Sequence, residues 1–180
     1  MRRIALTLFI IGVFVFVYFN KQSITLYPSP SVLGQQTKST GCVAKNGLPD
    51  STCTPGAIFK DATKDQICIN GYSASVRNVS VETKQKVYAE YGILSHVTGE
   101  YEVDHLISLE LGGNNDSANL WPEAASPTPG FHEKDMVENY LHYQVCHGII
   151  SLQKAQLEIS TNWLMVYQST PNIQKYQYGK

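Results

Sequence analysis

The sequence has few charged residues and no excess of basic ones. Charged residues make up 16% of the 180-residue chain and hydrophobic residues 43%, which excludes a disordered chain and a multispanning membrane protein. Between Gly41 and Thr170 there are 8 Lys and Arg against 15 Asp and Glu. The body of the chain therefore lacks the basic footprint of a protein that binds nucleic acid tightly through its phosphates.

The cysteine pattern lacks any C-x-x-C pair, which argues against a structural zinc site. The cysteines are Cys42, Cys53, Cys68 and Cys146. An even number of cysteines in an exported chain predicts two disulfides, for which three connectivities exist. We favour Cys42–Cys53, which closes a small loop, with Cys68–Cys146, which ties the early segment to a late helix. The sequence alone leaves the other two pairings open.

The N-terminus carries an apolar targeting segment without an A-x-A-like cleavage site. Arg2 and Arg3 precede the unbroken apolar run Ile4 to Phe19. Sixteen residues are short for a membrane span of about 20 and slightly long for a cleaved signal. We expect residues 1–21 to be a signal anchor, with a cleaved signal peptide as the alternative. The rest of the chain would then be exported, either anchored to the membrane and facing outward or secreted.

Composition divides the remainder of the chain. Residues 22–40 are rich in Ser, Pro and Gln and predict a linker. Residues 41–170 can bury a core and predict one domain, with 171–180 as a flexible tail. We expect the protein to be a monomer, and no internal repeat is present.

Local patterns predict the elements of this domain. Turn residues dominate 41–80, where we expect loops with short strands. Ser80 is placed to cap a helix over 81–91, and strands are expected over 101–105 and over 119–121, the latter ended by Pro122. A helix is expected over 131–147, and Ser151 is placed to cap another that ends near Tyr167. In that last helix the apolar residues Leu152, Ala155, Ile159, Trp163 and Val166 recur at helical spacing.

One stretch combines residues suited to hydrolytic chemistry. In order, it contains Glu102-Val103-Asp104-His105, Leu109-Glu110-Leu111-Gly112-Gly113, Asn119-Leu120-Trp121-Pro122 and His132-Glu133-Lys134-Asp135. This order of a strand, a Gly-Gly turn, a second strand and a polar helix resembles the HNH endonucleases. The resemblance implies a hairpin followed by a helix that together bind one divalent metal ion. This arrangement is known as the ββα-metal motif.

The similarity extends further for a subgroup of small exported HNH-like proteins. The additional matching segments are Leu48-Pro49-Asp50, Cys53-Thr54-Pro55-Gly56, Gly71-Tyr72, Val76-Arg77, Glu138, Leu141-His142, Val145-Cys146 and Ala155-Gln156. It covers about Gly41 to Tyr167. The fold class that it implies is α+β, with an HNH-like core, a disulfide-bearing N-terminal loop segment and a helical C-terminal extension.

The resemblance also implies roles for three residues. Asp104 matches the metal ligand and His105 the general base, and Asn119 matches the residue whose side chain holds the connecting loop. Carboxylates suit hard divalent cations, and histidine is the side chain best placed to accept a proton near neutral pH. Adjacent strand residues point to opposite faces, so both can serve one site only if the strand ends or bulges there.

The helix ligand departs from the family pattern. The family commonly places it about nine residues after the asparagine, where this chain has Thr128 in a Pro-rich loop. His132 is the first candidate, with Glu138 and His142 in reserve. Each also has an ordinary explanation, because His132 can simply begin a helix and Glu138 and His142 can form an i,i+4 surface pair.

These observations predict an exported, metal-dependent endonuclease of low sequence specificity. We expect one divalent ion, Mg²⁺, Mn²⁺ or Zn²⁺, and a nucleic-acid substrate, DNA ahead of RNA. Arg77, Lys84, Lys86 or Lys134 are candidates for a local basic patch. The alternatives are a non-catalytic, surface-anchored binding module on the same scaffold, and a hydrolase of another phosphoester.

Overall fold

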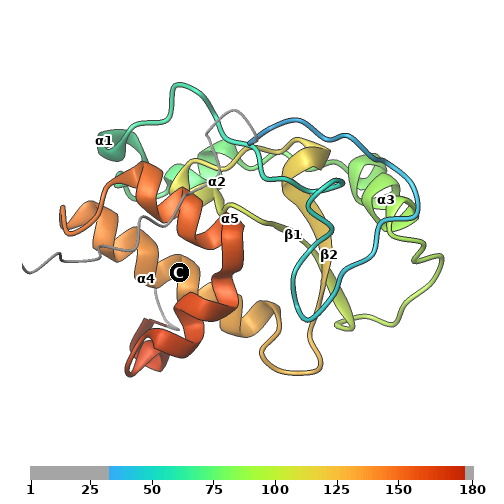
Figure 1. The fold of residues 1–180 in the computed structure, drawn as a ribbon. Helices are drawn as coiled ribbons and strands as arrows, with labels where there is room; N and C mark the ends of the chain where they lie inside the picture. Colours follow the sequence, from blue (N-terminus) through green and yellow to red (C-terminus); the bar gives the residue numbers. More distant parts are fainter. Residues whose placement is uncertain (1–32, 177–180) are drawn as a thin grey trace, which may run out of the picture.

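The structure is a computed structural model that describes residues 33–176, so the predicted targeting segment and most of the predicted linker lie outside the described residues. The fold is α+β, as predicted (Figure 1). Its α-helices are α1 (Lys64–Ile67), α2 (Tyr72–Val76), α3 (Val81–Glu90), α4 (Phe131–Cys146) and α5 (Leu152–Ser169). Its strands are β1 (Tyr101–His105) and β2 (Leu120–Ala124), and 3-10 turns lie at η2 (Leu109–Leu111), η3 (Ser117–Asn119) and η4 (Ile173–Tyr176).

The two strands pair as an antiparallel hairpin in which Asp104 lies opposite Trp121. The prediction that the second strand stops at Pro122 is wrong, because β2 continues through it. Pro122 pairs with Val103, and the hydrogen bonds from Leu106 N to Asn119 O and from Ala125 N to Glu100 O place that pair at a non-hydrogen-bonded position. Proline has no N–H to donate, but at this position no hydrogen bond between β1 and β2 is lost.

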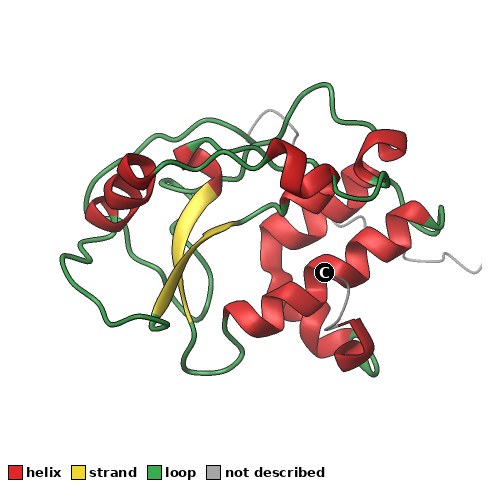
Figure 2. Cartoon of the chain, turned by 180° about the vertical axis from the view of Figure 1, so that it is seen from behind, coloured by secondary structure: helices red, strands yellow, loops and turns green. Residues whose placement is uncertain are grey.

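The hairpin lies between two apolar layers. On one face Val87 of α3 packs against Val103 and Leu120. The larger core lies towards α4 and α5, where Val137, Leu141, Ile159 and Trp163 are buried together with other apolar residues. Figures 1 and 2 show the two long helices side by side, across the hairpin from α3. This arrangement leaves the side chains of the hairpin's second face pointing at α4.

The predicted helices form for local reasons that the sequence carries. Ser80 caps α3 by accepting from Thr83 N at 3.1 Å, and Ser151 caps α5 by accepting from Lys154 N at 3.1 Å. Trp163 of α5 is fully buried and donates from Nε1 to Gly47 O at 3.0 Å. This bond ties the C-terminal extension to the N-terminal loop segment.

Both favoured disulfides are present, linking Cys42 to Cys53 and Cys68 to Cys146. They span 11 and 78 residues of sequence, and two disulfides are compatible with an oxidising or extracellular location. Among the helices of residues 33–176, none has the length and apolar character needed to cross a membrane.

Four segments differ from the expectation of loops, a linker or a tail. Residues 64–67 and 72–76 form short helices where loops with short strands are predicted, and the Thr63–Gln66 capping box explains the first. Within the predicted linker, Gln36 donates to Glu90 Oε2 at 3.0 Å. Past residue 170, Ile173 is 2% exposed and packs into the larger core.

Candidate active site

The centre of the candidate site is a buried lysine at the junction of α4 and the end of β1. Lys134 is fully buried, and its Nζ donates to Asp104 Oδ2 at 2.7 Å and to the backbone oxygen of His105 at 2.7 Å. Its third donor bond goes to Glu138 Oε1 at 2.5 Å, one helical turn along α4. A buried charge is tolerated only when it is paired and hydrogen-bonded, and here all three ammonium protons are bonded.

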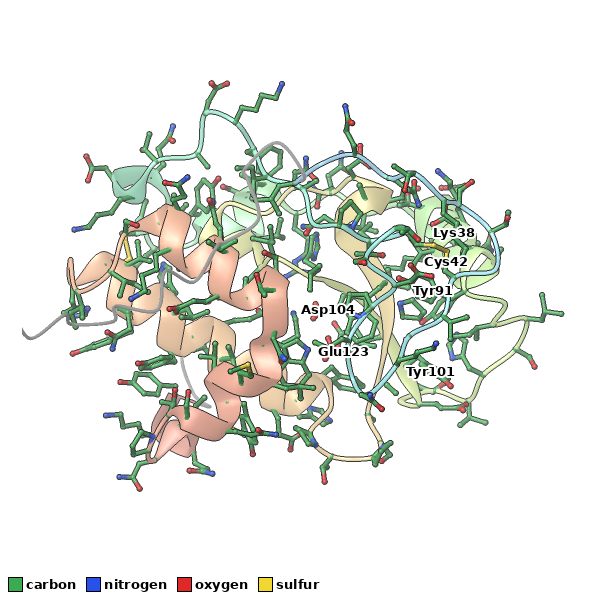
Figure 3. The ribbon with its side chains drawn as sticks, viewed as in Figure 1. Lys38, Cys42, Tyr91, Tyr101, Asp104 and Glu123 are labelled. Carbon is green, nitrogen blue, oxygen red and sulfur yellow. A yellow bond between two sulfur atoms is a disulfide. The ribbon has the colours of Figure 1, made fainter. Side chains whose placement is uncertain are left out.

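A third carboxyl group completes this acidic cluster. Glu123 of β2 is 1% exposed, and its Oε2 lies 3.9 Å from Lys134 Nζ. It shares a strand face with Asp104, because Asp104 lies opposite Trp121 and Glu123 is two residues farther along. Figure 3 shows Asp104 and Glu123 next to each other, between the hairpin and the long helices.

The electrostatics of the cluster follow from burial and from the single ammonium. Burial acts to raise the pKa of Asp104, but the charge and hydrogen bond of Lys134 outweigh it and hold that pKa below its ordinary value. Burial raises the pKa of Glu138 to about 7 and that of Glu123 well above its ordinary range. Lys134 remains charged, since the three carboxyl groups raise its pKa against the opposing effect of burial.

Glu123 differs from its neighbours in having no hydrogen-bond partner for either carboxyl oxygen. It lies close enough to Asp104 for a hydrogen bond to raise its pKa, but two carboxyl groups can share such a bond only if one is protonated. Glu123 is therefore the unsatisfied member of the cluster.

His105 is the last residue of β1 and pairs in register with Leu120. The ring is 2% exposed, and its Nε2 lies 3.2 Å from Asn115 Oδ1. The orientation of the Asn115 amide is fixed on both sides, because its Nδ2 donates to Val76 O at 2.9 Å and its Oδ1 accepts from Asn78 N at 3.1 Å.

The fixed amide assigns the tautomer of His105. Asn115 Oδ1 can only accept, so Nε2 of His105 carries the proton and Nδ1 holds the lone pair. Burial, with smaller contributions from Arg77 and Lys134, lowers the pKa of His105 to about 4 despite the opposing effects of Asp104 and Asn115. The ring is consequently neutral at neutral pH, with a basic nitrogen of defined position.

Asn119 holds the loop between the strands through four hydrogen bonds. Its Nδ2 donates to Ile107 O at 3.0 Å and to Asn114 O at 2.9 Å. Its Oδ1 accepts from Ile107 N at 2.9 Å and from Ala57 N at 3.3 Å. The side chain is fully buried and spans the loop that leaves His105. Asn119 therefore fixes the backbone of this loop.

The remaining candidate ligands are placed apart from Asp104. His132 is exposed, and its ring is tilted against that of Phe131, with ring centroids 4.3 Å apart. His142 faces the other way along α4, with Nε2 3.0 Å from Ile67 O and 3.4 Å from Cys146 Sγ. Of the predicted set, only Glu138 shares a partner with Asp104, and that partner is Lys134.

His142 belongs to a different group that could hold a metal ion. One ligand atom each from Cys68, His142 and Cys146 lies within 4.8 Å of the others. The two cysteines are joined as a disulfide, however, and thiolates are the form in which cysteine binds metal. This group is therefore a metal site only after reduction.

The surface around the cluster is less basic than predicted. Lys134 is buried and cannot contact a polyanion, while Arg77, Lys84 and Lys86 are exposed. Lys86 lies 3.7 Å from Glu90 in an i,i+4 ion pair. A cavity of about 560 Å³ borders β2, and Glu123, Trp121, Tyr101 and Leu164 are among its lining residues.

Comparison of the chain with protein-family models, with curated proteins and with solved structures finds no match. The site must be interpreted from its own geometry. Sequence reasoning does not single out Glu123 or Asn115 as site residues, and it places Lys134 on the surface. The alternation of side chains along β2 is the signal that bears on Glu123. The i,i+4 spacing of Lys134 and Glu138 is the signal that bears on Lys134.

Proposed function

We propose that the protein is an exported, metal-dependent endonuclease of the HNH type that hydrolyses phosphodiester bonds, with His105 as general base. The observation that carries the proposal is the state of His105. It is neutral, its tautomer is fixed by Asn115, and it directly follows Asp104 at the end of β1. The order of hairpin and helix, with Asn119 holding the loop, supports a ββα-metal core.

The base function requires a bare nitrogen that can take a proton from water. Nδ1 of His105 supplies it, and Asn115 keeps the other ring nitrogen protonated. As the imidazolium forms, the nearby Asp104 carboxylate favours it, because that charge raises the pKa of His105. Asn119 contributes by holding the backbone of residues 107 and 114, which are close in sequence to His105 and Asn115.

Asp104 is the proposed metal ligand on β1. Lys134 contacts Oδ2 of Asp104. The Asp104 side chain is 17% exposed, which leaves room for a metal ion on its solvent side. The donor set is acidic, and Mg²⁺ and Mn²⁺ favour carboxylate oxygens. Such an ion supplies charge stabilisation for the scissile phosphate and the leaving oxygen.

The substrate that we propose is nucleic acid, DNA ahead of RNA, bound weakly. The domain has seven more acidic than basic residues over 41–170, and the buried Lys134 is not available to phosphate. Exposed Arg77, which acts electrostatically on His105, is the basic residue best placed near the base. Binding should therefore weaken steeply with added salt.

The test is metal-dependent cleavage of supercoiled plasmid and of RNA, in Mg²⁺, Mn²⁺ or Zn²⁺ against a chelator. We expect nicking that is lost in His105→Ala and kept in His96→Ala, an exposed histidine whose ring lies 6.1 Å from that of Tyr101, at the opposite end of β1 from His105. Far-UV circular dichroism and thermal melting establish that the His105 variant is folded. Absence of cleavage by a folded, disulfide-bonded wild type in every metal would refute the proposal.

A second candidate function is a non-catalytic binding module on the same scaffold, anchored at the cell surface. The observation that favours it is the burial of His105, since a ring that is 2% exposed must be reached by water before it can act. Metal binding without cleavage of DNA, RNA or a small phosphodiester would support this function. Cleavage of the small diester alone would instead indicate a hydrolase of another phosphoester.

A further inference from the structure

We propose that Glu123 of β2 is the second protein ligand of the divalent cation, so that Asp104 and Glu123 hold the ion from one strand face while Lys134 lies behind them. This inference rests on the proposed metal requirement and deepens it. It places the metal ligands on the hairpin and assigns the ion to the hard, oxygen-seeking class of Mg²⁺ and Mn²⁺.

The first step is the donor capacity of the ammonium group. Lys134 has three N–H donors, which are bonded to Asp104, His105 O and Glu138 at 2.7, 2.7 and 2.5 Å. None remains for Glu123, whose nearer oxygen lies 3.9 Å from Nζ. The lysine pairs electrostatically with Glu123 but leaves it without a hydrogen bond.

The second step is the state of each carboxyl group. Glu138 is satisfied, because Oε1 accepts from Lys134 and Oε2 accepts from Ser108 Oγ at 2.9 Å. Glu123 is 1% exposed, and its carboxyl oxygens can form a hydrogen bond only with Asp104, and only when one of these two carboxyl groups is protonated. When both are ionised, the buried Glu123 carboxylate carries the cost of desolvation without a hydrogen-bond partner from the described residues.

The third step is charge. A divalent cation bound between Asp104 and Glu123 would stabilise both carboxyl groups in the ionised form, whereas without it burial keeps the pKa of Glu123 well above its ordinary range.

The fourth step is access and geometry. Asp104 and Glu123 are diagonal neighbours on one face of an antiparallel pair, a spacing that long side chains can bridge. The Asp104 side chain is 17% exposed, and Glu123 borders the cavity of about 560 Å³ beside β2 with both carboxyl oxygens buried. A hydrated ion would therefore approach on the Asp104 side, and Mg²⁺ commonly keeps several waters beside one or two carboxylates.

Neither histidine that the sequence offers as a helix ligand lies at the cluster. His132 is exposed with its ring tilted against that of Phe131, and Nε2 of His142 lies 3.0 Å from Ile67 O. The position on α4 that faces Asp104 is Lys134, a residue that cannot bind a metal ion while it is protonated. A ligand from β2 therefore replaces the helix ligand that the resemblance implies.

The test measures Mn²⁺ binding directly, by isothermal titration calorimetry on the full chain with its disulfides intact. We compare wild type with Glu123→Gln and Asp104→Asn, and use Glu90→Gln as the matched control. Glu90 is also a buried glutamate with one unpartnered oxygen, but it lies on α3 and its other oxygen accepts from Gln36. We expect Glu123→Gln and Asp104→Asn to weaken Mn²⁺ binding at least tenfold and Glu90→Gln to change it less than twofold.

Thermal melting separates loss of a ligand from loss of the fold. In chelator, Glu123→Gln should melt within a few degrees of wild type, because the amide removes a like-charge contact and fills the same volume. Addition of Mn²⁺ or Mg²⁺ should raise the melting temperature of wild type and of Glu90→Gln but not of Glu123→Gln. Should the glutamine variant fail to fold, Glu123→Asp is the substitute, with an affinity between those of wild type and Asp104→Asn.

Measuring both metal binding and cleavage distinguishes failure of the Glu123 inference from failure of the proposed nuclease activity. Mn²⁺ binding unchanged in Glu123→Gln but lost in Asp104→Asn would overturn the role of Glu123 while leaving the nuclease intact. Binding that depends on Glu123 in a protein that cleaves nothing would support the metal site and reject the proposed activity. No Mn²⁺ binding by folded wild type would overturn the inference outright.

Discussion

The ammonium of Lys134 lies 2.7 Å from Oδ2 of Asp104, with Lys134 fully buried. The pair connects the first strand of the hairpin to the first turn of α4, where the resemblance places a metal ligand. Because the same nitrogen also contacts the His105 backbone and Glu138, it fixes both candidate catalytic positions relative to the helix. The site is thus organised by a fixed cation of the protein as well as by any ion that binds.

Replacing Lys134 with methionine should destabilise the protein by about 3–5 kcal/mol, because it leaves buried carboxyl groups without their counter-charge. The measurement is urea unfolding in chelator. The control is Lys154→Met, which removes an exposed lysine whose partner Glu158 lies 3.7 Å away, and its cost should stay below about 1 kcal/mol. Equal costs for the two variants would show that the cluster does not depend on the ammonium.

Changing Asn115 to aspartate should raise the pKa of His105 above its value of about 4, because a carboxylate beside Nε2 favours the imidazolium. Histidine ring signals followed by NMR across pH report this directly, without any assay of activity. Asn70→Asp, an exposed turn residue, serves as the control and should leave the titration unchanged. A fixed His105 pKa in both variants would argue against the assigned contact.

Removing the Cys68–Cys146 disulfide by a double serine substitution should lower the free energy of unfolding by about 4 kcal/mol, from chain entropy alone. The reason is the 78-residue separation, which frees a long loop in the unfolded state. The same change at Cys42 and Cys53, only 11 residues apart, should cost about 3 kcal/mol. Paired denaturation curves test the order, and a larger loss for the short loop would contradict it.

Stability should fall in alkali because of Tyr91. Burial raises the pKa of its hydroxyl from 10.0 to about 12, against the hydrogen bond with Thr54 at 2.8 Å. Below pH 10 the hydroxyl is protonated in both states, so its contribution is complete. Between about pH 10 and 12 the unfolded chain loses this proton while the folded protein keeps it, so stability drops by about 2–3 kcal/mol.

Comparison with Tyr91→Phe isolates this contribution from other tyrosines, since Tyr72 and Tyr88 also have raised pKa values. The difference in unfolding free energy between wild type and variant should shrink as pH rises from 10 to 12. A difference that is constant across this range would show that Tyr91 ionises equally in the folded and unfolded states.

Local patterns in the sequence determined most of the elements. Ser80 and Ser151 begin their helices where their side chains can cap, and the strand over 101–105 has the predicted bounds. Periodicity in the last helix correctly identified Ala155, Ile159 and Trp163 as core. These features depend on neighbours within a few residues, so a sequence is sufficient to predict them.

The continuation of β2 through Pro122 depended on its partner strand. Proline ends a strand only if its position must donate to the ladder, and that is set by the register with Val103. No local pattern carries this register. The same holds for Ile173, which is buried only because the chain returns to the larger core after α5.

By itself, the sequence determined the even number of cysteines available for two disulfides and the chain order of Asp104, His105 and Asn119, because these follow from residue type, count and spacing. It left the cysteine pairing open, and the α+β class was an expectation from the family resemblance. Only the tertiary structure decided which polar groups meet. It buried Lys134 among the carboxyl groups, left Glu123 without a partner and exposed His132. The physical reason is that burial and hydrogen-bond saturation are properties of the packed neighbourhood, set by segments about 30 residues apart, such as Asp104 and Lys134.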